Sequence, residues 1–191
     1  MKKYLANTDA IDWQNPQVLG KAESLAKNCR TELEIAKKCF EFVRDEIKHS
    51  WDFKMNPVTW KASEVLQYAT GYCYAKSHLL AALLRANGIP AGLCYQRLTI
   101  TNDQPPFCLH GLNAIFLPEF GWYKVDARGN KVGVNAQFTP PLEQLAFEIK
   151  TTGEWDFSDI YAEPLEEVLT VLKQSQDFQQ VADNLPDIKS T

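Results

Sequence analysis

The 191-residue sequence has no long apolar run and no excess of basic residues. No stretch approaches the roughly 18 apolar residues of a membrane-spanning helix, and the two lysines near the start precede no apolar signal segment. Twenty lysines and arginines against 24 aspartates and glutamates give a formal net charge of −4. We therefore expect neither a nucleic-acid partner nor a membrane partner, because both bind basic surfaces.

Cysteine and histidine are also scarce, with five and three residues. An odd and widely scattered set of cysteines does not indicate a disulfide framework in a chain of this length, so we expect a reducing, cytoplasmic environment. The composition, 45% hydrophobic and 23% charged, is that of a globular protein. With no repeat and no evident boundary, the sequence predicts a single domain over residues 1–191.

One cysteine stands where a glycine-containing turn leads into an apolar helix. The apolar spacing predicts a helix from Ser77 to Asn87, which Gly88 and Pro90 bring to an end. Cys73 then lies in or next to the first turn, where unpaired N–H groups and the helix dipole stabilise an anion. This position favours the thiolate, the nucleophilic form of the side chain. The alternative is a cysteine that only packs in the core.

A nucleophilic cysteine needs a base, and two of the three histidines do not suit that role. His78 follows Cys73 by five residues and faces away from it, about 140° round the helix at roughly 100° per residue. We interpret His78 as a helix-face or packing histidine. His49 lies in a polar, aromatic connection after a predicted helix, where a turn or lid histidine is expected.

His110 is the candidate base, because it opens a predicted strand over 108–117. A short turn at 118–120 joins it to a strand over 121–127 that carries Asp126. This turn sets a register in which His110 and Asp126 are diagonal neighbours, about 7–8 Å apart. A carboxylate at that distance can fix the imidazole tautomer and stabilise the imidazolium.

The remaining pattern predicts helices before these strands and a further strand between them and the Cys73 helix. Short links between the strands indicate an antiparallel sheet and an α+β fold. The expected elements are helices at 16–29, after a Thr31 cap, after a Ser63 cap and from Pro164, a strand at 93–100, a loop at 102–106 and a frayed tail after Pro186. The 104–106 and 155–161 segments are candidate gates of a cleft.

These residues resemble the transglutaminase-like superfamily. Three blocks carry the resemblance in the same order: Gly71-Tyr72-Cys73 with its helix, His110–Leu117 and Gly121–Asp126. It covers about 35–130 and leaves a C-terminal helical extension at about 160–185. The resemblance implies a papain-like α+β fold, with N-terminal helices and a central helix packed on an antiparallel sheet. It implies Cys73 as nucleophile, His110 as base and then acid, and Asp126 as the residue that orients His110.

Two positions depart from the family pattern. Leu112 stands where an aromatic residue is frequent, and Ala127-Arg128 follow the aspartate where proline is frequent. An arginine so close in sequence could pair with Asp126 and compete with His110 for it.

The resemblance and the helix terminus both indicate the backbone N–H of Cys73 as one oxyanion donor. The sequence identifies no second donor, and Trp60 and Gln67 are the candidates. Tyr72 and Tyr74 are candidate walls of the cleft, with core packing as an equal alternative.

The expected reaction is acyl transfer from a peptide or side-chain amide of a protein through a thioester at Cys73. Hydrolysis by a peptidase or amidase is preferred, because water needs no second binding site, and transamidation is the close alternative. No metal or organic cofactor is implied. An inactive binding or scaffold protein with the same fold stays open, as does a zinc site at Cys94, Cys108 and His110. The sequence leaves the oligomeric state undetermined.

Overall fold

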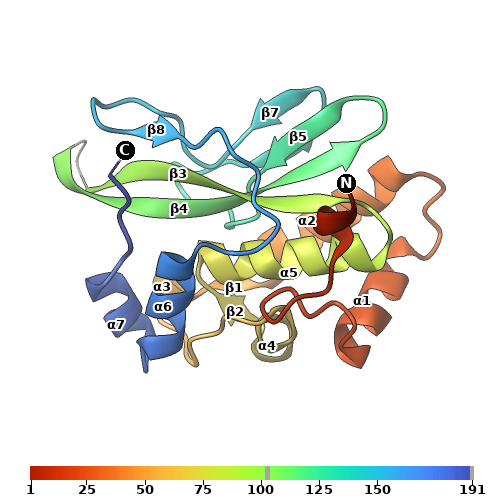
Figure 1. The fold of residues 1–191 in the computed structure, drawn as a ribbon, viewed down its shortest axis with the longest axis horizontal. Coiled ribbons are helices and arrows are strands. Elements are labelled where there is room, and N and C mark those ends of the chain that lie inside the picture. The colour runs from red at the N-terminus through yellow and green to blue at the C-terminus, as the bar shows by residue number, and fades with distance from the viewer. Residues whose placement is uncertain (102–103, 190–191) are drawn as a thin grey trace.

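A central helix, α5 (Cys73–Ala86), runs along one face of an antiparallel sheet (Figure 1). The computed structural model describes residues 1–101 and 104–189. All residues from Cys73 to Arg85 are buried, since this helix is covered on every side. The sheet has the order β5-β4-β3-β8, formed by β3 (Ala91–Thr101), β4 (Gln104–Leu117), β5 (Gly121–Val125) and β8 (Trp155–Asp156). This is the α+β architecture that the sequence predicts.

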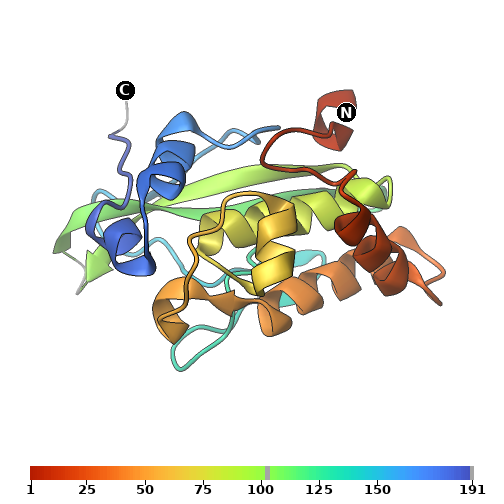
Figure 2. The same ribbon diagram turned by 90° about the horizontal axis from the view of Figure 1, so that it is seen from below.

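Three helices pack beside α5 beneath the sheet, as Figure 2 shows from below: α1 (Pro16–Ala26), α2 (Glu32–Glu46) and α4 (Ala62–Tyr68). Their apolar faces and the inner face of the sheet form one core with α5. The smaller elements are η1 (Lys2–Leu5), β1 (Lys48–His49), α3 (Ser50–Phe53), β2 (Thr70–Gly71), β6 (Gln137–Thr139), β7 (Leu142–Gln144), α6 (Glu166–Gln174) and α7 (Phe178–Asp183).

The pairing of β4 with β5 has the register that the short turn predicts, with Asn113 opposite Val125. Strand β5 ends at Val125, however, so Asp126 follows the strand instead of belonging to it. His110 pairs on its other side with Gln96 of β3. His110 and Asp126 therefore both lie near the point where β5 leaves the sheet. There the edge of β4 becomes accessible to other side chains.

Several predicted boundaries are wrong. Helix α5 begins at Cys73, four residues before the predicted start, and α1 ends at Ala26 instead of residue 29. Ser63 is inside α4 and bonds Asp12, because Lys61 occupies the N-cap position. Residues 104–106 belong to strand β4, while 102–103 lie outside the described residues.

The C-terminal segment is not frayed over its described part. Leu109 N–H donates to the carbonyl of Pro186 at 2.7 Å, and Asp187 forms an ion pair with Arg97. Residues 190–191 lie outside the described part of the chain. The segment after α7 is therefore held against β3 and β4, beside the residues that carry the candidate chemistry.

Within residues 1–101 and 104–189, no helix combines the length and the apolar character needed to cross a bilayer. In the same part of the chain, no three His, Cys, Asp or Glu side chains cluster at metal-binding distances. Cys94 lies opposite Leu112, two residues beyond His110 along β4, and both Cys94 and Leu112 pack in a small apolar cluster.

Candidate active site

Cys73 is the first residue of α5 and lines a cleft of about 990 Å³. The segment just before Cys73 is held in place, because β2 pairs in parallel with β1 and Thr59 donates a hydrogen bond to the carbonyl of Thr70. The side chain is 7% exposed, so the sulfur is largely sheltered but faces the cleft. The start of a helix supplies unpaired N–H groups and the positive end of the dipole.

Strand β4 passes directly over this helix terminus at a glycine. The backbone N–H of Gly111 donates to the Cys73 sulfur at 3.5 Å, which stabilises negative charge on it. A Cβ at Gly111 would lie 3.0 Å from the ring of Tyr74 and 3.1 Å from its Cα. Only glycine allows this close approach of strand and helix.

His110 and Asp126 form a buried pair, with the imidazole Nε2 and the carboxylate Oδ2 2.7 Å apart. Phe147 packs edge-on against the imidazole at a centroid distance of 5.0 Å. The bond to Asp126 occupies Nε2, so the other ring nitrogen, Nδ1, is left for a second partner. Ring position and tautomer are thus set by one carboxylate and one aromatic contact.

The pKa of His110 reflects these neighbours. Burial lowers it, but the negative charges of Asp126 and of a Cys73 thiolate, together with hydrogen bonds to both, raise it to about 10. These contributions link the three residues: the imidazole interacts with the carboxylate on one side and with the sulfur on the other. The arrangement favours an imidazolium at neutral pH.

Asp126 is fully buried and completely hydrogen-bonded. Besides His110, it accepts from the backbone N–H of Arg128 at 3.0 Å and that of Ala146 at 3.3 Å. Burial raises the pKa of this carboxyl, but His110 and the two backbone donors lower it below its ordinary value. The prediction that the Arg128 side chain competes for Asp126 is wrong, because its guanidinium pairs with Asp52 at 2.8 Å.

The other candidates from the sequence have different positions. Tyr72 and Tyr74 line the cleft, and their hydroxyls donate to the carbonyls of Phe178 and Leu109. Trp60 and Gln67 do not line the cleft: Gln67 is exposed on α4, and the Trp60 carbonyl bonds His78. His78 is fully buried in the core, as expected of a packing histidine.

His49, for which the sequence predicts a turn or lid role, lines the cleft. It is 7% exposed, and its ring packs edge-on against Tyr72. Burial, and next the charge of Arg128, hold its pKa well below 6.5, so the imidazole is neutral. Sequence periodicity could not reveal this position, because it results from a two-residue parallel pairing of His49 with Gly71.

Three comparisons with known proteins bear on this arrangement. The family model of the transglutaminase-like superfamily matches residues 20–127, more than half of the chain and all three candidate residues. The chain belongs to the transglutaminase-like superfamily. No curated protein matches it.

Comparison with solved structures finds proteins similar to this transglutaminase-like chain. One is a Cytophaga hutchinsonii protein whose name assigns it provisionally to the cysteine proteases, with 18% identity, a TM-score of 0.51, and coverage of 65% of this chain and 40% of that one. The periplasmic domain of TgpA from Pseudomonas aeruginosa has 20% identity, a TM-score of 0.46 and coverage of 59% and 42%. A structure named as a TGase has 13% identity, a TM-score of 0.47 and coverage of 97% and 54%.

The chain spans about 40% of the length of the Cytophaga protein. At such identities the likeness concerns the fold alone. The chemistry of this transglutaminase-like chain has to be argued from its own cleft.

Proposed function

We propose that this protein is a cysteine-dependent enzyme that cleaves amide bonds of peptides or proteins through a thioester. The observation that carries the proposal is the 2.7 Å bond between His110 and Asp126 in a cleft that also exposes Cys73. A thiolate at a helix start, a positioned imidazole and a buried carboxylate are the parts that such chemistry needs.

In the first step, the Cys73 thiolate attacks the amide carbonyl carbon. The new C–S bond displaces the carbonyl π electrons onto oxygen, and the backbone N–H of Cys73 is the proposed donor to that oxyanion. The intermediate collapses by breaking the C–N bond, and the His110 imidazolium gives its Nδ1 proton to the leaving amine. The amine departs, and the acyl group remains on sulfur as a thioester.

In the second step, water attacks the thioester carbonyl carbon, and the neutral His110 takes a proton from this water. The C–S bond then breaks and releases a carboxylic acid and the thiolate, which restores the starting charges. Asp126 keeps the imidazole in position through both steps, since Nε2 remains bonded to it. An amine in place of water would give transamidation by the same route.

The cleft suits a polypeptide substrate. Its volume of about 990 Å³ is at the upper end of the range for small-molecule sites, and α7 and the segment after it form one wall. Its charged lining includes both signs, with Lys131 and Lys150 against Glu148 and Asp183. Such a surface matches a mixed polar peptide better than a single charged metabolite.

Reaction of the purified protein with a panel of amide substrates and electrophilic probes, read by mass spectrometry, tests the proposal. We expect a covalent adduct on Cys73 that is absent in Cys73→Ala and forms more slowly in His110→Ala. Cys29→Ala is the matched control, because Cys29 is half-buried in the connection between α1 and α2, outside the cleft. An ordinary, His110-independent reactivity of Cys73 would favour the inactive scaffold instead. Incorporation of an added amine in preference to water would assign transamidation.

A further inference from the structure

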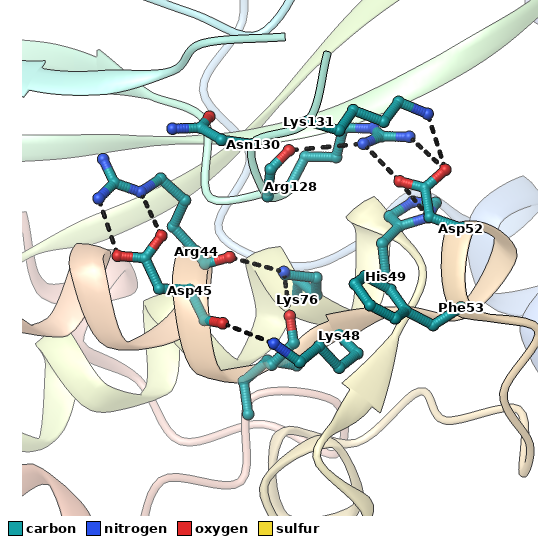
Figure 3. A pocket seen from close by; sticks show the side chains of 12 residues that line it. Arg44, Asp45, Lys48, His49, Asp52, Phe53, Lys76, Arg128, Asn130 and Lys131 are labelled. Atoms are coloured by element: carbon teal, nitrogen blue, oxygen red, sulfur yellow. Dashed lines mark hydrogen bonds and ion pairs between the residues drawn. The ribbon is translucent and has the colours of Figure 1, made fainter.

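A second cavity, of about 530 Å³, lies beside the catalytic cleft (Figure 3). Its walls come from the end of α2, from β1, from α3, from α5 and from the segment after Asp126. Cys73 and His110 do not line it, but His49, Arg128 and Lys131 line both spaces. The cavity is thus a neighbour of the proposed active site and has its own lining.

Basic side chains dominate this lining, although the whole chain has a net charge of −4. The five basic residues are Arg44, Lys48, Lys76, Arg128 and Lys131, and the two acidic residues are Asp45 and Asp52. Both carboxylates are already paired, Asp45 with Arg44 at 2.7 Å and Asp52 with Arg128 at 2.8 Å and Lys131 at 2.7 Å. The cavity therefore has positive charge that no carboxylate in its lining balances.

The excess charge is partly buried. Lys76 is 1% exposed, and its ammonium donates to the backbone carbonyls of Ile47 and Arg44. In Figure 3 the ammonium groups of Lys48 and Lys76 lie at the centre of the lining residues, between the Arg44–Asp45 and Arg128–Asp52 pairs. Burial, and next the charge of Arg128, lower the pKa of Lys76 to about 7, as expected where positive charges crowd together.

An unpartnered polar atom lies in the same wall. His49 is 7% exposed, and its buried Nδ1 has no hydrogen-bond partner among residues 1–101 and 104–189, since the Asp52 carboxylate oxygen is 3.8 Å away. Buried polar atoms in native proteins are nearly always bonded, so this nitrogen indicates a missing partner. A bound anion could compensate the charge, and a ligand hydroxyl or oxygen could satisfy the imidazole.

We propose that this cavity binds a phosphate group, as the free ion or as part of a small phosphorylated molecule. The arginine forks, which suit planar carboxylates, are occupied by Asp45 and Asp52. The other basic groups of the lining are the ammonium groups of Lys48, Lys76 and Lys131, and ammonium groups bind phosphate as point charges. The volume is within the range of small-molecule sites, so there is room for a phosphorylated molecule.

Isothermal titration calorimetry at constant ionic strength tests this site, with inorganic phosphate and glycerol 3-phosphate as probes and citrate as the carboxylate comparison. We expect saturable binding of at least one phosphate compound, about three- to tenfold weaker in Lys48→Gln and in Lys131→Gln. Lys38→Gln is the matched control, because Lys38 is exposed on α2 away from the cavity. Binding should persist in Cys73→Ala, since that side chain does not line the cavity.

The relative affinities of the two phosphate compounds assign the source of the phosphate, and either order supports the site. Three results would overturn the proposed site. These are no saturable binding of either phosphate compound, a phosphate affinity of Lys48→Gln and Lys131→Gln equal to that of the wild type, or tighter binding of citrate than of both phosphate compounds.

Discussion

Replacing Asp126 by asparagine removes one charge from the candidate site and almost no volume. Asparagine has one acceptor oxygen where the carboxylate has two, and Asp126 accepts from His110, Arg128 and Ala146. If the amide oxygen faces His110, its NH₂ group faces the backbone N–H of Arg128, so at least one buried donor loses its partner. We expect a loss of about 1–3 kcal/mol in the free energy of unfolding.

The same substitution removes the largest influence that raises the pKa of His110, so this pKa falls toward or below 6.5. A neutral imidazole stabilises a Cys73 thiolate far less than an imidazolium does. Alkylation by iodoacetamide follows the thiolate fraction and needs no known substrate, and its rate at neutral pH should fall roughly 10- to 100-fold.

Stopped alkylation reactions, with the Cys73 peptide quantified by mass spectrometry, measure this rate, and urea unfolding measures stability. Asp9→Asn serves as control, because Asp9 is exposed near the N-terminus. A folded Asp126→Asn variant that alkylates within about twofold of the wild type would refute the coupling of sulfur, imidazole and carboxylate.

Other consequences concern packing, the C-terminal segment and pH. Gly111→Ala should lower the free energy of unfolding by about 1–3 kcal/mol and slow Cys73 alkylation, because the new Cβ would lie 3.1 Å from the Tyr74 backbone. An unchanged alkylation rate would contradict the close contact between β4 and α5. Asp187→Asn weakens the ion pair with Arg97, so it should lower the free energy of unfolding by about 1 kcal/mol and speed proteolysis of the C-terminal segment. Proteolysis at the wild-type rate would show that this pair does not hold the segment. Because the pKa of His110 is raised from 6.5 to about 10, its stabilising contribution is complete below 6.5, declines above it and is gone beyond about pH 10. The urea midpoint should therefore fall more steeply over this range in the wild type than in His110→Gln, and parallel curves would contradict the shift.

The sequence predicts the fold and the approach of His110 to Asp126 well, because both depend on local patterns. Apolar spacing identifies α5, and a short turn fixes the register of β4 with β5, with Asn113 opposite Val125. This register brings Asp126, which directly follows β5, within reach of His110 on β4.

Features that depend on long-range contacts were not predictable. His49 reaches the cleft through a pairing of two residues, too short for any periodic signal. The segment after α7 is fixed by contacts with Leu109 and Arg97, about 77 and 90 residues earlier, which composition alone cannot indicate. Neither Trp60 nor Gln67, the candidate oxyanion donors, lines the cleft: Gln67 is exposed on α4, and Trp60 precedes that helix with its carbonyl bonded to His78.

The proposed reaction requires Cys73 to be an acyl-accepting nucleophile that His110 activates. Its most direct test is trapping of the thioester: incubation with a reactive amide or ester, acid quench, and intact-mass and peptide mapping of the wild type and of His110→Ala. We expect an acyl adduct on Cys73 that forms rapidly in the wild type and at least about 100-fold more slowly in the variant. Acylation at equal rates in both proteins, or on other cysteines in place of Cys73, would contradict it.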